Sequence, residues 1–146
     1  MKLISIRQPW ASLIINGGRN RKGKIVHKDI ENRSWPCSYR DTLGIHASQT
    51  KTGLKDLLQY VADNCDITVD EDELVFGAVI GSVKMTDCVF ASHRSIWFEG
   101  DYGFVLKAPL AYAEPIPCKG QLRLYERPEL APALAKYERL RKGGKR

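Results

Sequence analysis

Three stretches in the first third of the chain decide its fold: Ser5-Ile6-Arg7-Gln8-Pro9-Trp10, Lys28-Asp29-Ile30-Glu31-Asn32-Arg33-Ser34-Trp35 and Gly44-Ile45-His46-Ala47-Ser48. The first alternates apolar and polar residues and then reaches proline and tryptophan, which predicts a strand followed at once by a helix. The second and third stretches are short, with turn residues between them. They predict a pair of strands, over residues 30–35 and 42–47.

The second stretch contains the pattern K-x-x-E-x-R, formed by Lys28, Glu31 and Arg33. Side chains alternate between the two faces of a strand, so Glu31, Arg33 and Trp35 are expected on one face. A face with an acid, a base and an aromatic ring suits a polar site better than a core. The alternative is an ordinary ion-pair network, since exposed pairs are common and contribute little to stability.

The order and spacing of these stretches resemble the ASCH domain, which is related to the PUA superfamily of RNA-binding β-barrels. The resemblance continues in three later segments: 77–83, 101–106 and 115–120. The family pattern reads G-x-K-x-x-E-x-R and its glycine falls on Val26 here, so residues 19–27 are interpreted as an insertion. The fold class is therefore expected to be α+β, a small mixed β-barrel with two or three flanking helices.

Periodicity predicts the other elements. Apolar residues recur at helical spacing in three segments: 10–16, 50–64 and 129–141. Strands are predicted over five more: 2–8, 74–89, 102–107, 110–117 and 121–125. Gly77 and Gly81 are expected at bulges or sharp bends, and the polar residues 19–28 in a mobile loop. The domain is expected at 1–127, followed by a C-terminal helix and basic tail at 128–146.

The chain has 146 residues, a length that predicts one domain able to bury a core. It contains no apolar run of the roughly 18 residues needed to cross a membrane and no signal-peptide pattern, so we expect a cytoplasmic protein. Its cysteines lie far apart, with neither a C-x-x-C pair nor a close histidine: Cys37, Cys65, Cys88 and Cys118. They argue against a zinc site and predict reduced thiols. We expect no metal and no cofactor.

The formal net charge of +6 is concentrated in two segments. Residues 19–28 contain five basic residues and no acid: Arg19, Arg21, Lys22, Lys24 and Lys28. Residues 136–146 contain six basic residues and one acid, so each segment carries +5 and the rest of the chain carries −4. Such patches favour a polyanionic partner, because each neutralised phosphate releases counterions. The alternative is a solvated loop and tail that only aid solubility.

The strongest chemical candidates are Lys28, Glu31 and Arg33. Glu31 is expected to hold Lys28 or Arg33 in the wall of a cleft. Lys28 would present a cation to a phosphate, or act as a base if burial lowers its pKa. Arg33 would make a planar, two-pronged contact to a phosphate or a base edge.

Five further residues are candidates for the same cleft. The Gln8 amide could read a base edge, because it both donates and accepts hydrogen bonds. Trp10 opens the helix that borders the cleft and would add to specificity, or it simply packs in the core. Trp35 could stack on a base, as could Trp97 and Tyr102, or pack in the barrel core. His46 could face the same side as Glu31 and carry protons, with Ser48 on its face, although a lone histidine can equally be structural.

The resemblance implies two classes of function. The first is a module that binds RNA, single-stranded nucleic acid or a nucleotide in a cleft between the first helix and the barrel. The second is a hydrolase. One ASCH branch resembles an amidohydrolase of N4-acetylcytidine with the pattern K-x-x-T, where this chain has Glu31, and other members are reported to cleave RNA. Lys28, Glu31 and His46 would then be catalytic. A barrel that only contacts proteins is a third possibility, and the oligomeric state stays open.

Overall fold

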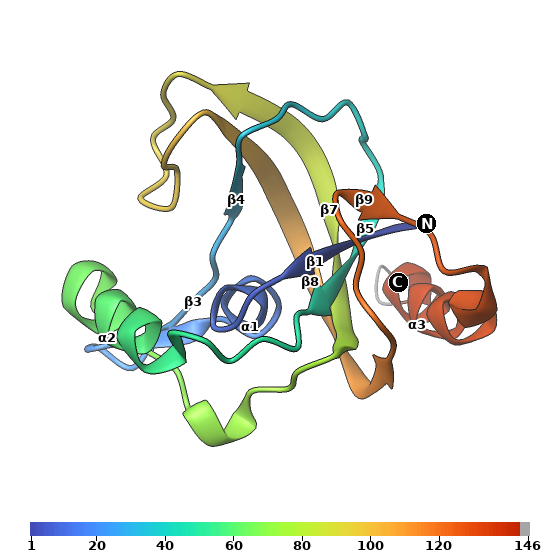
Figure 1. Ribbon diagram of the computed structural model, residues 1–146, viewed down its shortest axis with the longest axis horizontal. Coiled ribbons are helices and arrows are strands. Elements are labelled where there is room, and N and C mark those ends of the chain that lie inside the picture. The colour runs from blue at the N-terminus through green and yellow to red at the C-terminus, as the bar shows by residue number, and fades with distance from the viewer. Residues whose placement is uncertain (144–146) are drawn as a thin grey trace.

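The computed structural model describes residues 1–143 and shows a curled six-stranded sheet with three helices (Figure 1). The strands of this sheet are β1 (Lys2–Ile6), β4 (Ile30–Arg33), β5 (Thr42–Ala47), β7 (Ala78–Phe90), β8 (Tyr102–Pro117) and β9 (Leu124–Tyr125). The helices are α1 (Trp10–Ile15), α2 (Leu54–Cys65) and α3 (Ala131–Gly143). In Figure 1, α2 and α3 lie at opposite ends of the long axis, with α1 between them.

The strand order is β4-β8-β7-β5-β1-β9. Strands β1 and β5 are parallel, whereas the other neighbours are antiparallel, so the sheet is mixed as predicted. The sheet curls into a half-barrel. Its two edge strands, β4 and β9, do not pair with each other, so the barrel does not close through hydrogen bonds. The predicted pairing of the strands at 30–35 and 42–47 was wrong. The connection over 34–41 is no tight turn, and it lets β4 pair with β8 while β5 lies between β1 and β7.

The predicted loop at 19–28 was also wrong, because this segment forms a hairpin. Strands β2 (Gly18–Asn20) and β3 (Ile25–Val26) pair with each other, and β6 (Ile67–Thr68) joins β2 on its other side. The Asn20 side chain accepts hydrogen bonds from the backbone amides of Lys22 and Lys24, both at 3.0 Å, and this stabilises the turn. The two strands predicted at 102–107 and 110–117 are likewise one strand, β8, which bends at Ala108 with a positive φ of 53°.

Two 3-10 turns, η1 (Glu71–Glu73) and η2 (Pro128–Leu130), complete the elements. Helix α1 packs its buried face into the main core, together with β5, β7 and β8. Helix α3 packs on the barrel through Leu134 and through Tyr137, whose ring stacks on Tyr112 with centroids 4.0 Å apart. The segment 128–143 is therefore docked on the barrel. No helix in residues 1–143 is long and apolar enough to span a membrane.

The predicted bulge at Gly81 is confirmed, because the register between β7 and β8 shifts between Val79 and Gly81. A Cβ atom at Gly81 would overlap the backbone oxygen of Leu110, which cannot move without disturbing the sheet. We expect Gly81→Ala to lower the free energy of unfolding by about 1–3 kcal/mol in urea denaturation. Gly143→Ala is the matched control, since a Cβ there meets nothing within 4 Å, and an equal loss in both variants would contradict this packing.

Candidate functional site

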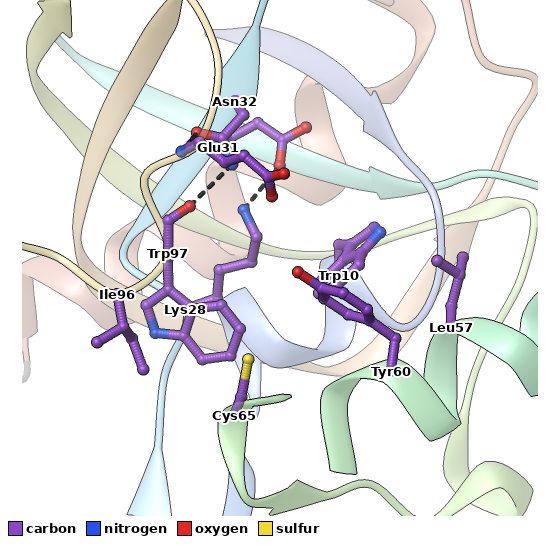
Figure 2. Close-up of a pocket in the computed structure, with 10 residues that line it drawn as sticks. Trp10, Lys28, Glu31, Asn32, Leu57, Tyr60, Cys65, Ile96 and Trp97 are labelled. Atoms are coloured by element: carbon purple, nitrogen blue, oxygen red, sulfur yellow. Dashed lines mark hydrogen bonds and ion pairs between the residues drawn. The ribbon is translucent and has the colours of Figure 1, made fainter. Parts of the chain in front are cut away.

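A pocket of about 380 Å³ opens between α1, α2, β4 and the loop over residues 91–101 (Figure 2). It is lined by Trp10, Lys28, Glu31, Asn32, Leu57, Tyr60, Cys65, Ile96, Trp97 and Glu99. We call it the aromatic pocket. Figure 2 shows the Lys28 side chain between Trp97 on one side and Trp10 and Tyr60 on the other, reaching toward Glu31.

One carboxylate holds two cations at the base of this pocket. The Lys28 ammonium lies 3.1 Å from Glu31 Oε1, and the Arg33 guanidinium lies 2.9 Å from Glu31 Oε2. Lys28 Nζ also donates to the Ile30 carbonyl and lies 5.9 Å from the centre of the Trp10 ring. Glu31 and Arg33 share a face of β4, as strand alternation predicts, while Ile30 on the other face is fully buried. The side chains of Lys28 and Glu31 are only 5% and 11% exposed, so the pair is a buried one.

The walls of the aromatic pocket come from segments far apart in sequence. Trp10 on α1 meets Tyr60 on α2 edge to face, with centroids 6.4 Å apart. Trp97 is buried, and the Asn32 amide holds its loop on β4 by donating to the Trp97 carbonyl at 2.8 Å and accepting from the Glu99 amide at 2.9 Å. Tyr60 was not among the predicted site residues, although it is an aromatic residue beside the apolar stripe of α2 and lines the pocket.

Three of the predicted residues line a different pocket, of about 580 Å³, which we call the basic pocket. Its lining residues are Ser5, Arg33, His46, Ser48, Gln49, Thr50, Lys119, Gly120, Gln121, Leu122 and Arg123. Arg33 thus lies between the two pockets, because it lines the basic pocket and pairs with Glu31 of the aromatic pocket. The structure brings Arg33, His46 and Ser48 together, but it separates His46 and Ser48 from the pocket that Lys28 lines.

His46 is buried in a network at the floor of the basic pocket. Its Nδ1 lies 3.0 Å from the Ser5 hydroxyl and its Nε2 donates to the Cys118 carbonyl at 2.8 Å. Ser5 in turn bonds the Tyr125 hydroxyl at 2.8 Å. The expectation that His46 faces Glu31 across a common cleft is therefore corrected. Alternation along β5 predicted which face of the strand carries His46. It could not predict that β5 lies between β1 and β7, where His46 is the register partner of Ser5.

The buried His46 gives stability a pH dependence. Burial lowers the pKa of His46 from its ordinary value of 6.5, so the unfolded chain takes up a proton at pH values where the folded protein does not. The stability that the protein keeps with a neutral, buried His46 is complete above the pKa of the unfolded chain. It is lost as the pH falls below about 6.5, because the unfolded chain is then protonated first. We expect the thermal midpoint to drop on acidification below that pH, and His46→Gln to flatten this drop. The exposed His93 is the control, and parallel curves for wild type and His46→Gln would contradict the prediction.

The other predicted residues lie outside the aromatic pocket. Gln8 is buried and its amide is occupied within the fold, since it donates to the Val75 carbonyl at 2.9 Å and accepts from the Ser12 amide at 2.8 Å. Gln8 thus bonds an amide in the first turn of α1, and its own amide is not free to read a base. Trp35 packs edge to face on Phe104, with ring centroids 5.1 Å apart. The Arg123 guanidinium lies over the Trp35 ring, 4.6 Å from its centroid.

The basic hairpin also lies apart from the aromatic pocket. Arg21 pairs with Asp66 at 3.0 Å, with both side chains largely exposed. Arg19 donates to the Gly23 carbonyl at 2.9 Å and lines a separate pocket that Asp70 and Glu73 make partly acidic. Lys22 and Lys24 are exposed at the turn. Of the second basic segment, residues 144–146 lie outside the described residues.

No protein-family model matches the chain. Human Activating signal cointegrator 1 is 24% identical over 135 residues, which cover 84% of this chain and 22% of that protein. The chain therefore spans about a fifth of the length of this relative. The crystal structure of a mutant ZmASCH protein from Zymomonas mobilis matches the fold with a TM-score of 0.51 and 17% identity, covering 92% of this chain and 96% of the other.

The chain thus has the fold of the ZmASCH protein, a curled mixed sheet with flanking helices, and its sequence is similar to part of Activating signal cointegrator 1.

Proposed function

We propose that this chain binds single-stranded RNA, or a nucleotide, by placing an unpaired base in the aromatic pocket. The observation that supports this most is the set of rings from α1, α2 and the 91–101 loop around one buried ion pair. Aromatic side chains stack on any base, at about 1–3 kcal/mol per base in single-strand binders. A volume of about 380 Å³ lies at the small end of the range for ligand sites, which suits one base or nucleoside and not a folded duplex.

The ion pair at the base of the pocket fits a neutral, hydrogen-bonding ligand. Lys28 is paired with Glu31 and bonded to a backbone carbonyl, so its positive charge is largely compensated. Glu31 lines the pocket and accepts three hydrogen bonds from the two cations, which leaves one of its four lone-pair sites for an exocyclic amino group of a base. The exposed cations of the hairpin, Lys22 and Lys24, would add long-range attraction for a polyanion without touching the base.

The direct test is binding of four fluorescently labelled homohexamers, rA6, rC6, rG6 and rU6, over a salt series. We expect at least one to bind the wild-type protein at low salt, and to bind more tightly than the others. Because the four hexamers carry the same charge, such a preference would come from the bases. Affinity should fall as salt rises, because phosphate contacts release counterions. If neither the four hexamers nor the four nucleoside monophosphates bind at low salt, the proposal is contradicted.

A hydrolase is the second candidate, and the buried Lys28–Glu31 pair inside the pocket is the observation that favours it. In that case Lys28 would stabilise developing negative charge and Glu31 would activate water. His46 has no place in this version, because it lines the other pocket. Mass spectrometry of hexamers and of N4-acetylcytidine after incubation separates the two functions. A new product that requires Lys28 would establish an enzyme, whereas unchanged ligands would leave a binding protein.

A further inference from the structure

We infer that the basic pocket holds the phosphodiester backbone of a single-stranded nucleic acid whose base occupies the aromatic pocket. This inference rests on the proposed function and makes it more specific, because a free nucleoside would use only the aromatic pocket. The ligand would then be a polynucleotide strand that crosses the Glu31–Arg33 pair from one pocket to the next.

The charge of the basic pocket supports a phosphate ligand. Arg33, Lys119 and Arg123 line it, and no Asp or Glu does so within residues 1–143. Lys119 and Arg123 are exposed, and neither forms an ion pair with another described residue. The aromatic pocket is different, since Glu31 compensates the cation that lines it. Of the two pockets, only the basic one therefore carries net positive charge toward a ligand.

The segment that carries Lys119 and Arg123 is fixed before any ligand binds. The Cys118 carbonyl accepts from His46, and the Lys119 carbonyl accepts from Arg127 at 2.7 Å. Gly120 lies so close to the floor that a Cβ atom would overlap the Ser5 hydroxyl. These contacts anchor the segment against β1 and β5. A ligand would thus meet cations whose backbone is already ordered, which reduces the entropy lost on binding.

Arg123 is held in an uncommon backbone conformation that presents its side chain to the pocket. Its φ is 59°, in the left-handed region that residues other than glycine rarely adopt. Its guanidinium lies 4.6 Å from the centre of the Trp35 ring, which leaves the planar edge free for oxygen ligands. Such outliers persist where the surrounding structure enforces them and are common at ligand sites.

The two pockets are joined by the Glu31 carboxylate. One oxygen pairs with Lys28 in the aromatic pocket and the other with Arg33 in the basic pocket. Arg33 also donates to the Ser5 carbonyl at 3.0 Å, which fixes its guanidinium at the boundary. A strand with one base among the rings would therefore have its neighbouring phosphates beside Arg33, and the next ones toward Lys119 and Arg123.

The test compares the double variant Lys119→Gln/Arg123→Gln with the control Lys55→Gln/Lys107→Gln, which removes two exposed positive charges that line neither pocket. The probes are the homohexamer that wild type binds best and the same hexamer with uncharged methylphosphonate linkages. We expect the first variant to bind the phosphodiester hexamer about tenfold more weakly at low salt. Its salt slope should fall by about 1.4, or about 0.7 for each lost phosphate contact. The control should stay within about twofold of wild type.

Three results would overturn the inference. Equal affinities for the two double variants would show that the basic pocket does not bind the strand, and the proposed function would stand if Trp10→Leu still weakened binding. Equal binding of both probes by wild type would exclude phosphate contacts. Competition by a hexaglutamate peptide as strong as that by the unlabelled hexamer would assign the pocket to an acidic protein segment instead. Melting curves of all variants confirm that each remains folded.

Discussion

Glu31→Ala is expected to lower the free energy of unfolding by about 3–5 kcal/mol. Glu31 compensates two cations at once, and one of them, Lys28, is 5% exposed. Removing the carboxylate leaves that ammonium buried with only the Ile30 carbonyl and the Trp10 ring as partners. An uncompensated buried charge costs more free energy than the ion pair contributes to stability. The loss measured for Glu31→Ala is therefore larger than the net contribution of the ion pair.

Two further variants show whether burial is the cause. Asp66→Asn breaks the exposed pair with Arg21, and we expect a loss below about 1 kcal/mol. Adding Lys28→Met to Glu31→Ala removes the buried charge and should restore part of the lost stability. Urea denaturation measures all of these variants. Losses of similar size for Glu31→Ala and Asp66→Asn, or no recovery in the double variant, would contradict a buried pair.

Trp10→Leu is expected to weaken binding of the best-bound homohexamer by about 5- to 150-fold, which corresponds to about 1–3 kcal/mol of lost base stacking. Leucine keeps an apolar group at the start of α1, where Trp10 is half-buried against the core, and removes the ring that faces Tyr60. Fluorescence anisotropy at fixed salt measures the change, and the salt slope should stay unchanged because no phosphate contact is lost.

Tyr102→Leu is the matched control for this experiment. Tyr102 is also a half-buried aromatic residue, on β8, but it lines neither the aromatic nor the basic pocket. Its replacement should leave hexamer affinity within about twofold of wild type. If both variants lose affinity to the same extent, the loss reflects general destabilisation and not stacking in the aromatic pocket.

The parts of the site that the sequence predicted correctly are local. The K-x-x-E-x-R pattern placed Glu31 beside Lys28 and Arg33, because residues two and three apart near one strand can meet without any knowledge of the sheet. The apolar stripe of α2 follows from helical periodicity, and the bulge at Gly81 from a glycine inside a predicted strand, so both are also local signals. The resemblance to the ASCH domain supplied the global fold that these local patterns could not.

The errors arose where position depends on strand order. Alternation gave the face of β5 that carries His46, but not that β5 would lie two strands away from β8 and three from β4. Lys119 and Arg123 had no pattern of their own, since β9 brings their segment to the basic pocket by pairing with β1. The hairpin of β2 and β3 was predicted as a loop because its sequence is rich in charged residues. Asn20, whose side chain bonds the turn amides, was the signal for its turn.

Insertion of a base into the aromatic pocket is best tested by NMR on the three tryptophan indole N–H signals, from Trp10, Trp35 and Trp97. We expect titration with the nucleoside monophosphate of the preferred base to shift the Trp10 and Trp97 signals, while the homohexamer also shifts Trp35 beside Arg123. Binding that leaves both Trp10 and Trp97 unchanged would contradict the proposal and place the ligand elsewhere on the protein.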